Sequence, residues 1–109
     1  MAVNYKVLGQ VAPLGDTLTD VYTVPAGVEA IVSTISICSR SSAVAVRIAI
    51  RPNGETIEDK HYIVHDVTVE QFEAIFLTVG VTLSAGDVIS VYNTTEDSSF
   101  NVYGSEITG

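Results

Sequence analysis

The stretch VYTVPAGVEAIVSTISIC, residues Val21 to Cys38, contains two strand-like runs separated by one turn signal. Pro25 presets the negative φ of a turn, and Gly27 can adopt the positive φ that follows it. The run after the turn is rich in β-branched residues, which pack well on a pleated sheet. We therefore predict a turn at 25–27 and a central strand from Glu29 to Cys38. Ile31, Ile35 and Ile37 should lie on one face of this strand, and Thr34, Ser36 and Cys38 on the other.

Strand and turn signals continue along the whole chain. The segment Val44–Arg51 alternates strictly, and its inward face should carry Val44, Val46, Ile48 and Ile50. The segment Ala74–Val81 is apolar at nearly every position, so we expect this strand to be covered on both faces. Further extended segments are predicted at 4–11, 18–24, 61–65, 66–73, 88–93 and 100–107. The sequence therefore predicts an all-β fold: a single antiparallel β-sandwich or jelly-roll-like domain of about eight strands over residues 1–109.

The charge balance restricts the partners that this chain can have. It contains 5 Lys and Arg against 13 Asp and Glu, which gives a net charge of −8. A nucleic-acid binder needs a basic face and a polybasic membrane anchor needs a basic cluster, so we expect neither nucleic acid nor membrane as a partner. No apolar run reaches the roughly 18 residues of a membrane span. The first ten residues also lack the pattern of a signal peptide, so we expect synthesis in a cytoplasm.

The apolar content is high for a small protein with so few charges. Apolar residues make up 47% of the chain and charged residues 17%, whereas about 25% charged residues is typical. This surplus indicates that partners cover part of the surface, and we expect a homo-oligomer. The alternative is a surface rich in Ser and Thr that needs less charge.

Two histidines, His61 and His65, are the first candidates for metal ligands. On a helix their spacing would bring them together. The residues between them favour a strand, however, in which they lie about 13 Å apart. A metal–nitrogen bond is only about 2 Å long. We therefore expect two histidines at the surface or rim, with no bound metal and no other cofactor.

The remaining reactive residues form no recognisable catalytic motif. Cys38 is the one cysteine, and without a neighbouring His or cation we interpret it as a buried packing residue rather than a nucleophile. Six acidic residues gather in a segment that we interpret as a solvated loop: Glu55, Glu58, Asp59, Asp66, Glu70 and Glu73. No nucleophile elbow and no phosphate-binding loop is present. We predict no catalytic residues and a protein that is not an enzyme.

Several strings of the sequence have a pattern of strands and turns that is more specific than the composition. They are VLGQVAP, VYTVPAG, STISICSR, RIAIRPNGE, KHYIVHD, LTVGVTLSAGDVISVY and FNVYGSEIT. Over these strings, from Val7 to Thr108, the chain resembles a group of small virion structural proteins of tailed bacteriophages, cyanophages prominent among them. The resemblance implies a capsid decoration (cement) protein in the virion, a trimer that binds the major capsid protein at the outer junctions of its subunits. The alternative is a tail, neck or fibre-associated protein, with or without a glycan-binding face.

Two parts of the sequence are candidates for contacts with neighbouring subunits. The first is the N-terminal strand, which could add to a neighbour's sheet edge, and its candidate contact residues are Val3, Tyr5 and Val7. The second is a set of cations that need partners or solvent, and that are the natural counter-charges of the acidic segment within the same assembly. These cations are Arg40, Arg47 and Arg51.

Overall fold

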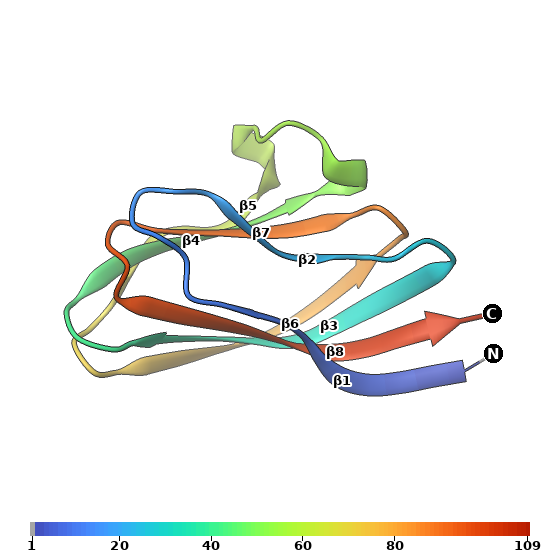
Figure 1. Ribbon diagram of the computed structural model, residues 1–109, viewed down its shortest axis with the longest axis horizontal. Helices are drawn as coiled ribbons and strands as arrows, with labels where there is room; N and C mark the ends of the chain where they lie inside the picture. Colours follow the sequence, from blue (N-terminus) through green and yellow to red (C-terminus); the bar gives the residue numbers. More distant parts are fainter. Residues whose placement is uncertain (1) are drawn as a thin grey trace.

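The computed structural model describes residues 2–109, which form eight β-strands and two short 3-10 helices (Figure 1). The strands are β1 (Ala2–Val11), β2 (Thr19–Thr23), β3 (Val28–Ser39), β4 (Val44–Arg51), β5 (Tyr62–Val69), β6 (Ala74–Leu83), β7 (Val88–Asn93) and β8 (Ser98–Thr108). The helices η1 (Pro52–Gly54) and η2 (Asp59–His61) lie between β4 and β5. No helix in the described part of the chain is long and apolar enough to cross a membrane.

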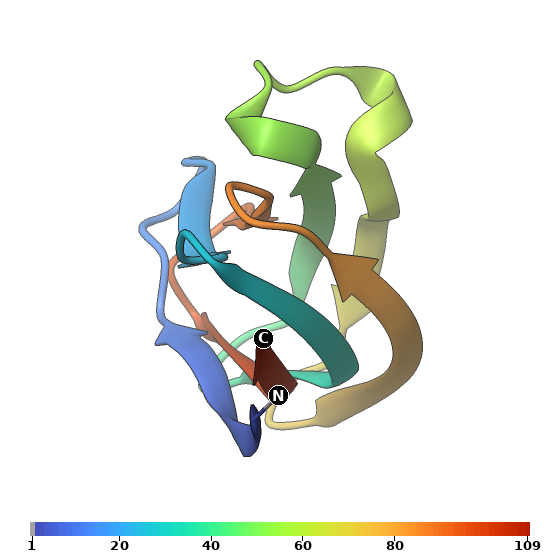
Figure 2. The same cartoon turned by 90° about the vertical axis from the view of Figure 1, so that its right-hand side faces the viewer.

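The strands form two four-stranded antiparallel sheets that pack face to face (Figures 1 and 2). We name them by a central strand: the β3 sheet has the order β1-β8-β3-β6, and the β4 sheet has the order β2-β7-β4-β5. The pairs β1–β8, β2–β7, β3–β6 and β4–β5 join strands from mirrored positions in the chain. This is the arrangement of a long hairpin folded over on itself, as in a jelly roll. The predicted fold class is confirmed.

The core lies between the two sheets and consists mainly of aliphatic side chains. The inward side chains of β4 are buried as predicted, with Val44, Val46 and Ile48 at 1% exposure or less. They pack against Phe100 and Val102 of β8 and Ile89 and Val91 of β7, all of which belong to the same buried cluster. Burial of this cluster removes apolar surface from water and is the main driving force for folding.

β3 changes the face that it turns to the core part-way along its length. Val32 is buried before an irregularity in register between Val32 and Thr34, and Ile35 and Ile37 are buried after it. An extra residue in one strand reverses the alternation beyond it. Ile31 therefore lies on the outer face, 39% exposed. The prediction that the three isoleucines share one face was therefore wrong for Ile31, while Ile35 and Ile37 do share a face.

The same strand places Cys38 differently from the prediction. After the irregularity, Ile37 points into the core and Cys38 points outward, where it is half-buried. The prediction of a buried residue was therefore wrong, because the neighbouring position and not Cys38 belongs to the core. Cys38 pairs in register with Ser99 of β8 and Ala74 of β6, so its surroundings are small and uncharged.

β6 is an edge strand, so the prediction that both of its faces are covered was wrong. Its inward residues Ile75, Leu77, Val79 and Val81 pack against the core. The residues between them are exposed, and Phe76 has 69% of its surface exposed. An edge strand with an apolar outer face therefore has the same nearly continuous apolar sequence as a strand that is buried on both sides.

Gly104 allows β8 to approach β3 closely. A Cβ atom at this position would lie 2.0 Å from the carbonyl oxygen of Ile31, so the β3 backbone would have to move. We predict that Gly104→Ala lowers the free energy of unfolding by about 2–3 kcal/mol in urea denaturation. The control is Gly80→Ala, since a Cβ there meets nothing within 4 Å and should change stability by less than about 1 kcal/mol. Equal stability of the two variants would contradict the close approach.

Candidate interaction surface

The outer face of the β3 sheet is almost free of charge, and we call it the uncharged face. Alternation and register place the following residues on it: Val3, Tyr5, Val7 and Gln10 of β1; Ser99, Asn101, Tyr103, Ser105 and Ile107 of β8; Glu29, Ile31, Thr34, Ser36 and Cys38 of β3; Ala74, Phe76, Thr78, Gly80 and Thr82 of β6. Within residues 2–109, Glu29 is the only acidic or basic residue at a strand position on this face. The uncharged face forms the lower side of the molecule in Figure 1.

The size of this face suits a protein contact. Four strands about 4.8 Å apart and ten residues long, at about 3.4 Å per residue, cover roughly 600 Å². Each partner in a standard interface contributes about 800 Å². A chain with a net charge of −8 whose β3 sheet carries only Glu29 as a charge on its outer face therefore has a surface that a partner can cover with little desolvation of charges.

Three of the predicted interface residues lie together on the uncharged face. Val3, Tyr5 and Val7 project from β1 and are 40%, 86% and 45% exposed. Their neighbours in register on β8 are Ile107, Ser105 and Tyr103. The structure thus joins the apolar row of β1 to the rest of the sheet, and β1 itself lies at the sheet edge as the sequence prediction required.

Glu106 anchors this edge strand to the other sheet. Its two carboxylate oxygens accept hydrogen bonds from the Tyr22 hydroxyl on β2 at 2.6 Å and from Lys6 Nζ on β1 at 3.1 Å. Burial and the contact with Glu106 raise the pKa of Tyr22. Lys6 therefore points away from the uncharged face and toward the second sheet.

The second predicted group, the arginines, already has partners within the chain. Arg47 lies on the outer face of the β4 sheet, where its Nε donates a hydrogen bond to Asp66 Oδ1 at 2.6 Å. Its guanidinium also lies over the ring of Tyr92, 4.6 Å from the centroid. The hydrogen bond from Arg47 lowers the pKa of Asp66. Arg47 thus pairs with Asp66 of the acidic segment within the same chain.

Arg51 and Arg40 hold loops in place. Arg51 Nη2 donates to Asp20 Oδ1 at 2.8 Å and its Nη1 donates to the carbonyl of Glu55 at 2.9 Å, so its acidic partner, Asp20, lies outside the acidic segment. Arg40 donates to the carbonyl oxygens of Glu96 and Ser98. None of the three arginines lies on the uncharged face, and each makes intramolecular hydrogen bonds.

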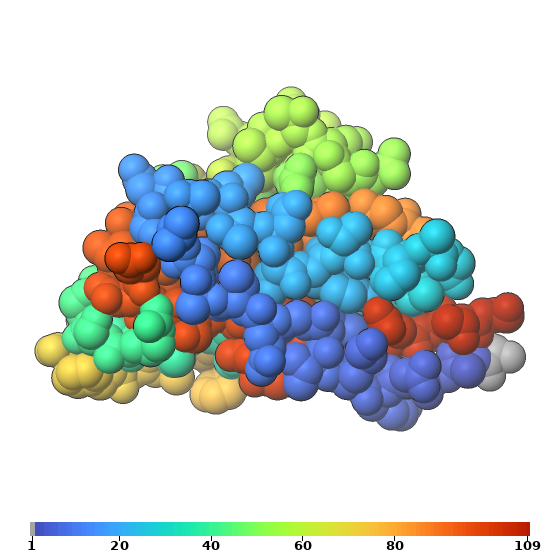
Figure 3. Space-filling view, viewed as in Figure 1, coloured from blue at the N-terminus to red at the C-terminus, as the bar shows by residue number. Residues whose placement is uncertain are grey.

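His61 is buried, which contradicts the prediction of a rim histidine. It is 4% exposed, while His65, with 52% of its side chain exposed, lies at the surface as predicted. Nδ1 of His61 accepts a hydrogen bond from the Glu58 backbone N–H at 3.0 Å, and Nε2 lies 3.2 Å from Glu55 Oε1. The ring therefore cross-links the loop of η1 and η2, which stands above the rest of the surface in Figure 3.

The same three residues have the spacing of metal ligands but the wrong hydrogen bonding. Glu55, Glu58 and His61 offer ligand atoms within 4.8 Å of one another. Because Nδ1 accepts from a backbone N–H, the proton of the neutral ring lies on Nε2, the nitrogen that faces Glu55. A metal at Nε2 would require that proton to move to Nδ1, against the Glu58 donor. The arrangement favours a structural role for His61.

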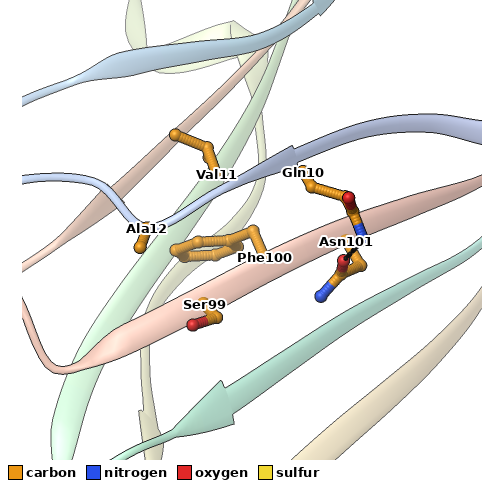
Figure 4. A pocket seen from close by; sticks show the side chains of 6 residues that line it. All are labelled: Gln10, Val11, Ala12, Ser99, Phe100 and Asn101. Atoms are coloured by element: carbon orange, nitrogen blue, oxygen red, sulfur yellow. Dashed lines mark hydrogen bonds between the residues drawn. The ribbon is translucent and has the colours of Figure 1, made fainter.

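A hollow of about 440 Å³ lies at one end of the β3 sheet, between β1 and β8 (Figure 4). Its lining residues are Gln10, Val11, Ala12, Ser99, Phe100 and Asn101. The amide of Gln10 donates to Asn101 Oδ1 at 2.7 Å, so the two largest polar groups satisfy each other. The lining contains no acid, base or thiol, so it does not have the groups of a catalytic site. Its polar residues lie at the border of the uncharged face.

Sequence reasoning identified the β1 part of this face and missed the β3 and β6 parts. The missed residues include Ile31, Phe76, Thr78 and Thr82. A signal was present in β6, where every second residue from Ala74 to Thr82 is small, polar or aromatic and uncharged. A strict period-2 analysis of this run would have indicated an exposed outer face.

Comparison with known proteins identifies no relative. A scan against protein-family models finds no match to this chain, and a search of curated proteins also finds none. The fold and the uncharged face therefore have to support the functional interpretation, together with the resemblance described from the sequence.

The anchor at Glu106 predicts a specific dependence of stability on pH. Hydrogen bonds from Tyr22 and Lys6 hold the pKa of Glu106 below its usual value of 4.5. A carboxyl whose pKa is lower in the folded state contributes stability that is present above about pH 4.5 and is lost as the pH falls through the folded pKa. We predict that the melting temperature falls more steeply between about pH 5 and pH 3 in the wild type than in Glu106→Gln.

Thermal unfolding followed by circular dichroism at several pH values measures this difference. Glu70→Gln is the control, because Glu70 is exposed at the β5–β6 turn and should keep the wild-type pH profile. Parallel profiles for the wild type and Glu106→Gln would contradict the role of Glu106 as an anchor.

Proposed function

We propose that this chain is a non-enzymatic structural protein of a virus particle, a capsid decoration protein that binds the outer capsid surface where major capsid subunits meet. The observation that carries the proposal is the uncharged face. A strongly acidic chain keeps one complete sheet face free of charge apart from Glu29 at one end, and such a face is suited to permanent burial against another protein.

The distribution of charge over the rest of the surface supports the same function. The charges of the β4 sheet are paired within the chain, as in the contact of Arg47 with Asp66 and that of Arg51 with Asp20. The remaining acidic groups keep the free protein soluble and oppose stacking through other surfaces. The outer face of the β3 sheet is therefore suited to a partner, whereas the charged groups on the β4 sheet already form ion pairs within the chain.

The fold supports a structural role without specifying it. Jelly rolls occur in viral capsid proteins, and also in lectins and cupins, so the fold alone does not decide the function. The resemblance of the sequence to virion structural proteins of tailed phages favours the capsid among these. The lining of the hollow between β1 and β8 has no group suited to catalysis or to binding a cofactor.

The proposed mechanism is cooperative clamping of the shell. Each copy contributes a modest interface, and many copies on one lattice sum their effects. Because the protein binds the assembled shell and not its separated subunits, binding shifts the equilibrium toward the assembled state. The resemblance implies that copies act as trimers, whereas the unpaired edge of β6 favours the pairing of two copies.

We predict that a charge on the uncharged face weakens capsid binding. Tyr5→Glu places a carboxylate on a side chain that is 86% exposed, so the fold is retained while the contact has to bury a charge. Binding of purified protein to capsids that lack it, measured by co-sedimentation, should weaken at least tenfold, on the order of 1.4 kcal/mol. The control is Thr68→Glu, an exposed position on the β4 sheet, which should bind like the wild type.

Equal binding of the two variants would show that the uncharged face is not the docking surface. The number of copies in purified particles separates the capsid from the tail. Decoration requires on the order of hundreds of copies, whereas a count of roughly a dozen would place the protein in the tail, neck or fibre and would overturn the proposal.

A further inference from the structure

β6 is the least protected edge of the sandwich. Natural edge strands are kept from pairing with other chains by charges, prolines, irregularities or short length. Each of the other three edge strands in the described residues has such features. β1 carries Lys6, β2 has only five residues and includes Asp20, and β5 carries Asp66 at a positive φ of 58°.

β6 has none of the chemical features that protect the other edges. Its ten residues, AIFLTVGVTL, contain no acidic or basic residue and no proline. It has β3 as its only neighbour in the sheet, so the other side of its backbone lacks a strand partner. In Figure 2, β6 lies at the right-hand margin with no other segment beyond it.

The first half of β6 has the regularity that a further strand needs. Its pairing with β3 runs without a shift from Ala74, opposite Cys38, to Thr78, opposite Thr34. A register irregularity follows between Thr78 and Val81. A regular uncharged segment of five residues is therefore available, centred on Phe76, which is 69% exposed.

Because the free edge of β6 is an uncharged segment that can pair with its own equivalent, we propose that β6 of one copy pairs with β6 of a second copy, antiparallel and about a two-fold axis at Phe76. This register places Phe76 beside its equivalent, and Ile75 and Ala74 beside Leu77 and Thr78 of the second copy. Aromatic and β-branched cross-strand pairs of this kind stabilise antiparallel sheets. A two-fold contact is isologous, so the same segment supplies both halves of the interface.

Repulsion between acidic residues favours the antiparallel direction over the parallel one in this pair. The turn that precedes β6 contains Glu70 and Glu73, joined by a hydrogen bond from the Glu73 N–H to the Glu70 carbonyl at 3.1 Å. A parallel pair would place the two Glu73 side chains about 5 Å apart. The antiparallel pair separates them by about 20 Å, which is beyond the screening length of about 8 Å in physiological salt.

The paired molecule would extend the uncharged face. Joining two β3 sheets through β6 gives one continuous eight-stranded sheet, whose outer side contains both uncharged faces. The contact through five residues is smaller than the roughly 800 Å² per partner of a standard interface. We therefore expect a dimer that dissociates at micromolar concentrations and not a permanent one.

Disulfide cross-linking tests the register directly. In a Cys38→Ser background, Phe76→Cys places two cysteines opposite each other across the two-fold axis, with Cα atoms about 4.5–5.5 Å apart. Mild oxidation of the purified protein should convert most of it to a linked dimer. The control is Thr82→Cys on the same strand and face, which the proposed register keeps about 40 Å from its equivalent. Equal cross-linking of the two variants would overturn the proposal.

Sedimentation equilibrium tests the dimer without a cysteine. Between about 10 and 500 μM the wild type should shift from the mass of one 11.6 kDa chain toward that of two. Phe76→Glu places like charges directly opposite each other and should stay monomeric, while Thr82→Glu should associate like the wild type. A wild type that remains a monomer or forms a trimer would overturn the proposal. So would a Phe76→Glu variant that dimerises as strongly as the wild type.

These tests use free protein and are independent of the capsid. Both glutamate variants alter exposed side chains, and unchanged circular dichroism spectra would show that they remain folded. Loss of the dimer with retained capsid binding would refute the pairing alone. A dimer that fails to bind capsids would refute the proposed function alone.

Discussion

The pairing of β3 with β8 in the centre of one sheet is the contact on which the rest of the structure depends. It joins residues 28–39 to residues 98–108, which are far apart in the chain, and it places β1 on one side and β6 on the other. The close approach at Gly104 and the extra residue in β3 occur at the same point along this pair. Together they determine which residues of β3 face the core and which face outward.

This reversal determines which residues β3 contributes to the uncharged face. Ile31, before the extra residue, and Thr34 and Cys38, after it, all lie outside, while the larger Ile35 and Ile37 remain in the core. The β4 sheet differs because its outer face contains ion pairs, with Arg47 and Arg51 held by acidic groups of the same chain. One sandwich therefore presents two chemically different faces, and the uncharged one is suited to a protein partner.

Much of the fold could be predicted from the sequence because it is encoded locally. Alternation in 44–51 and the turn at Pro25 to Gly27 are period-2 and φ-angle signals, and both correspond to the observed elements. The errors concern long-range features. The extra residue in β3 depends on its two neighbouring strands, and the edge position of β6 depends on the order of strands in the sheet, neither of which a local pattern contains.

The candidate surface was predictable to a similar degree. Alternation in an N-terminal strand places Val3, Tyr5 and Val7 in one row, and the structure exposes this row. The partners of Arg51 and the burial of His61 did not follow, because Asp20 and the η1–η2 loop approach these residues only in three dimensions. The composition gave the most general signal, because the chain has fewer charged residues than is typical of a small protein. In the structure, the outer face of the β3 sheet is the surface that lacks charged residues.

A reconstruction of the virus particle at a resolution that traces β-strands would test the central claim most directly. The account predicts density for this protein at many equivalent positions on the outer shell, with the outer face of the β3 sheet against the capsid and the η1–η2 loop in solvent. A particle in which the β4 sheet faces the capsid, or in which the protein is absent from the shell, would contradict it.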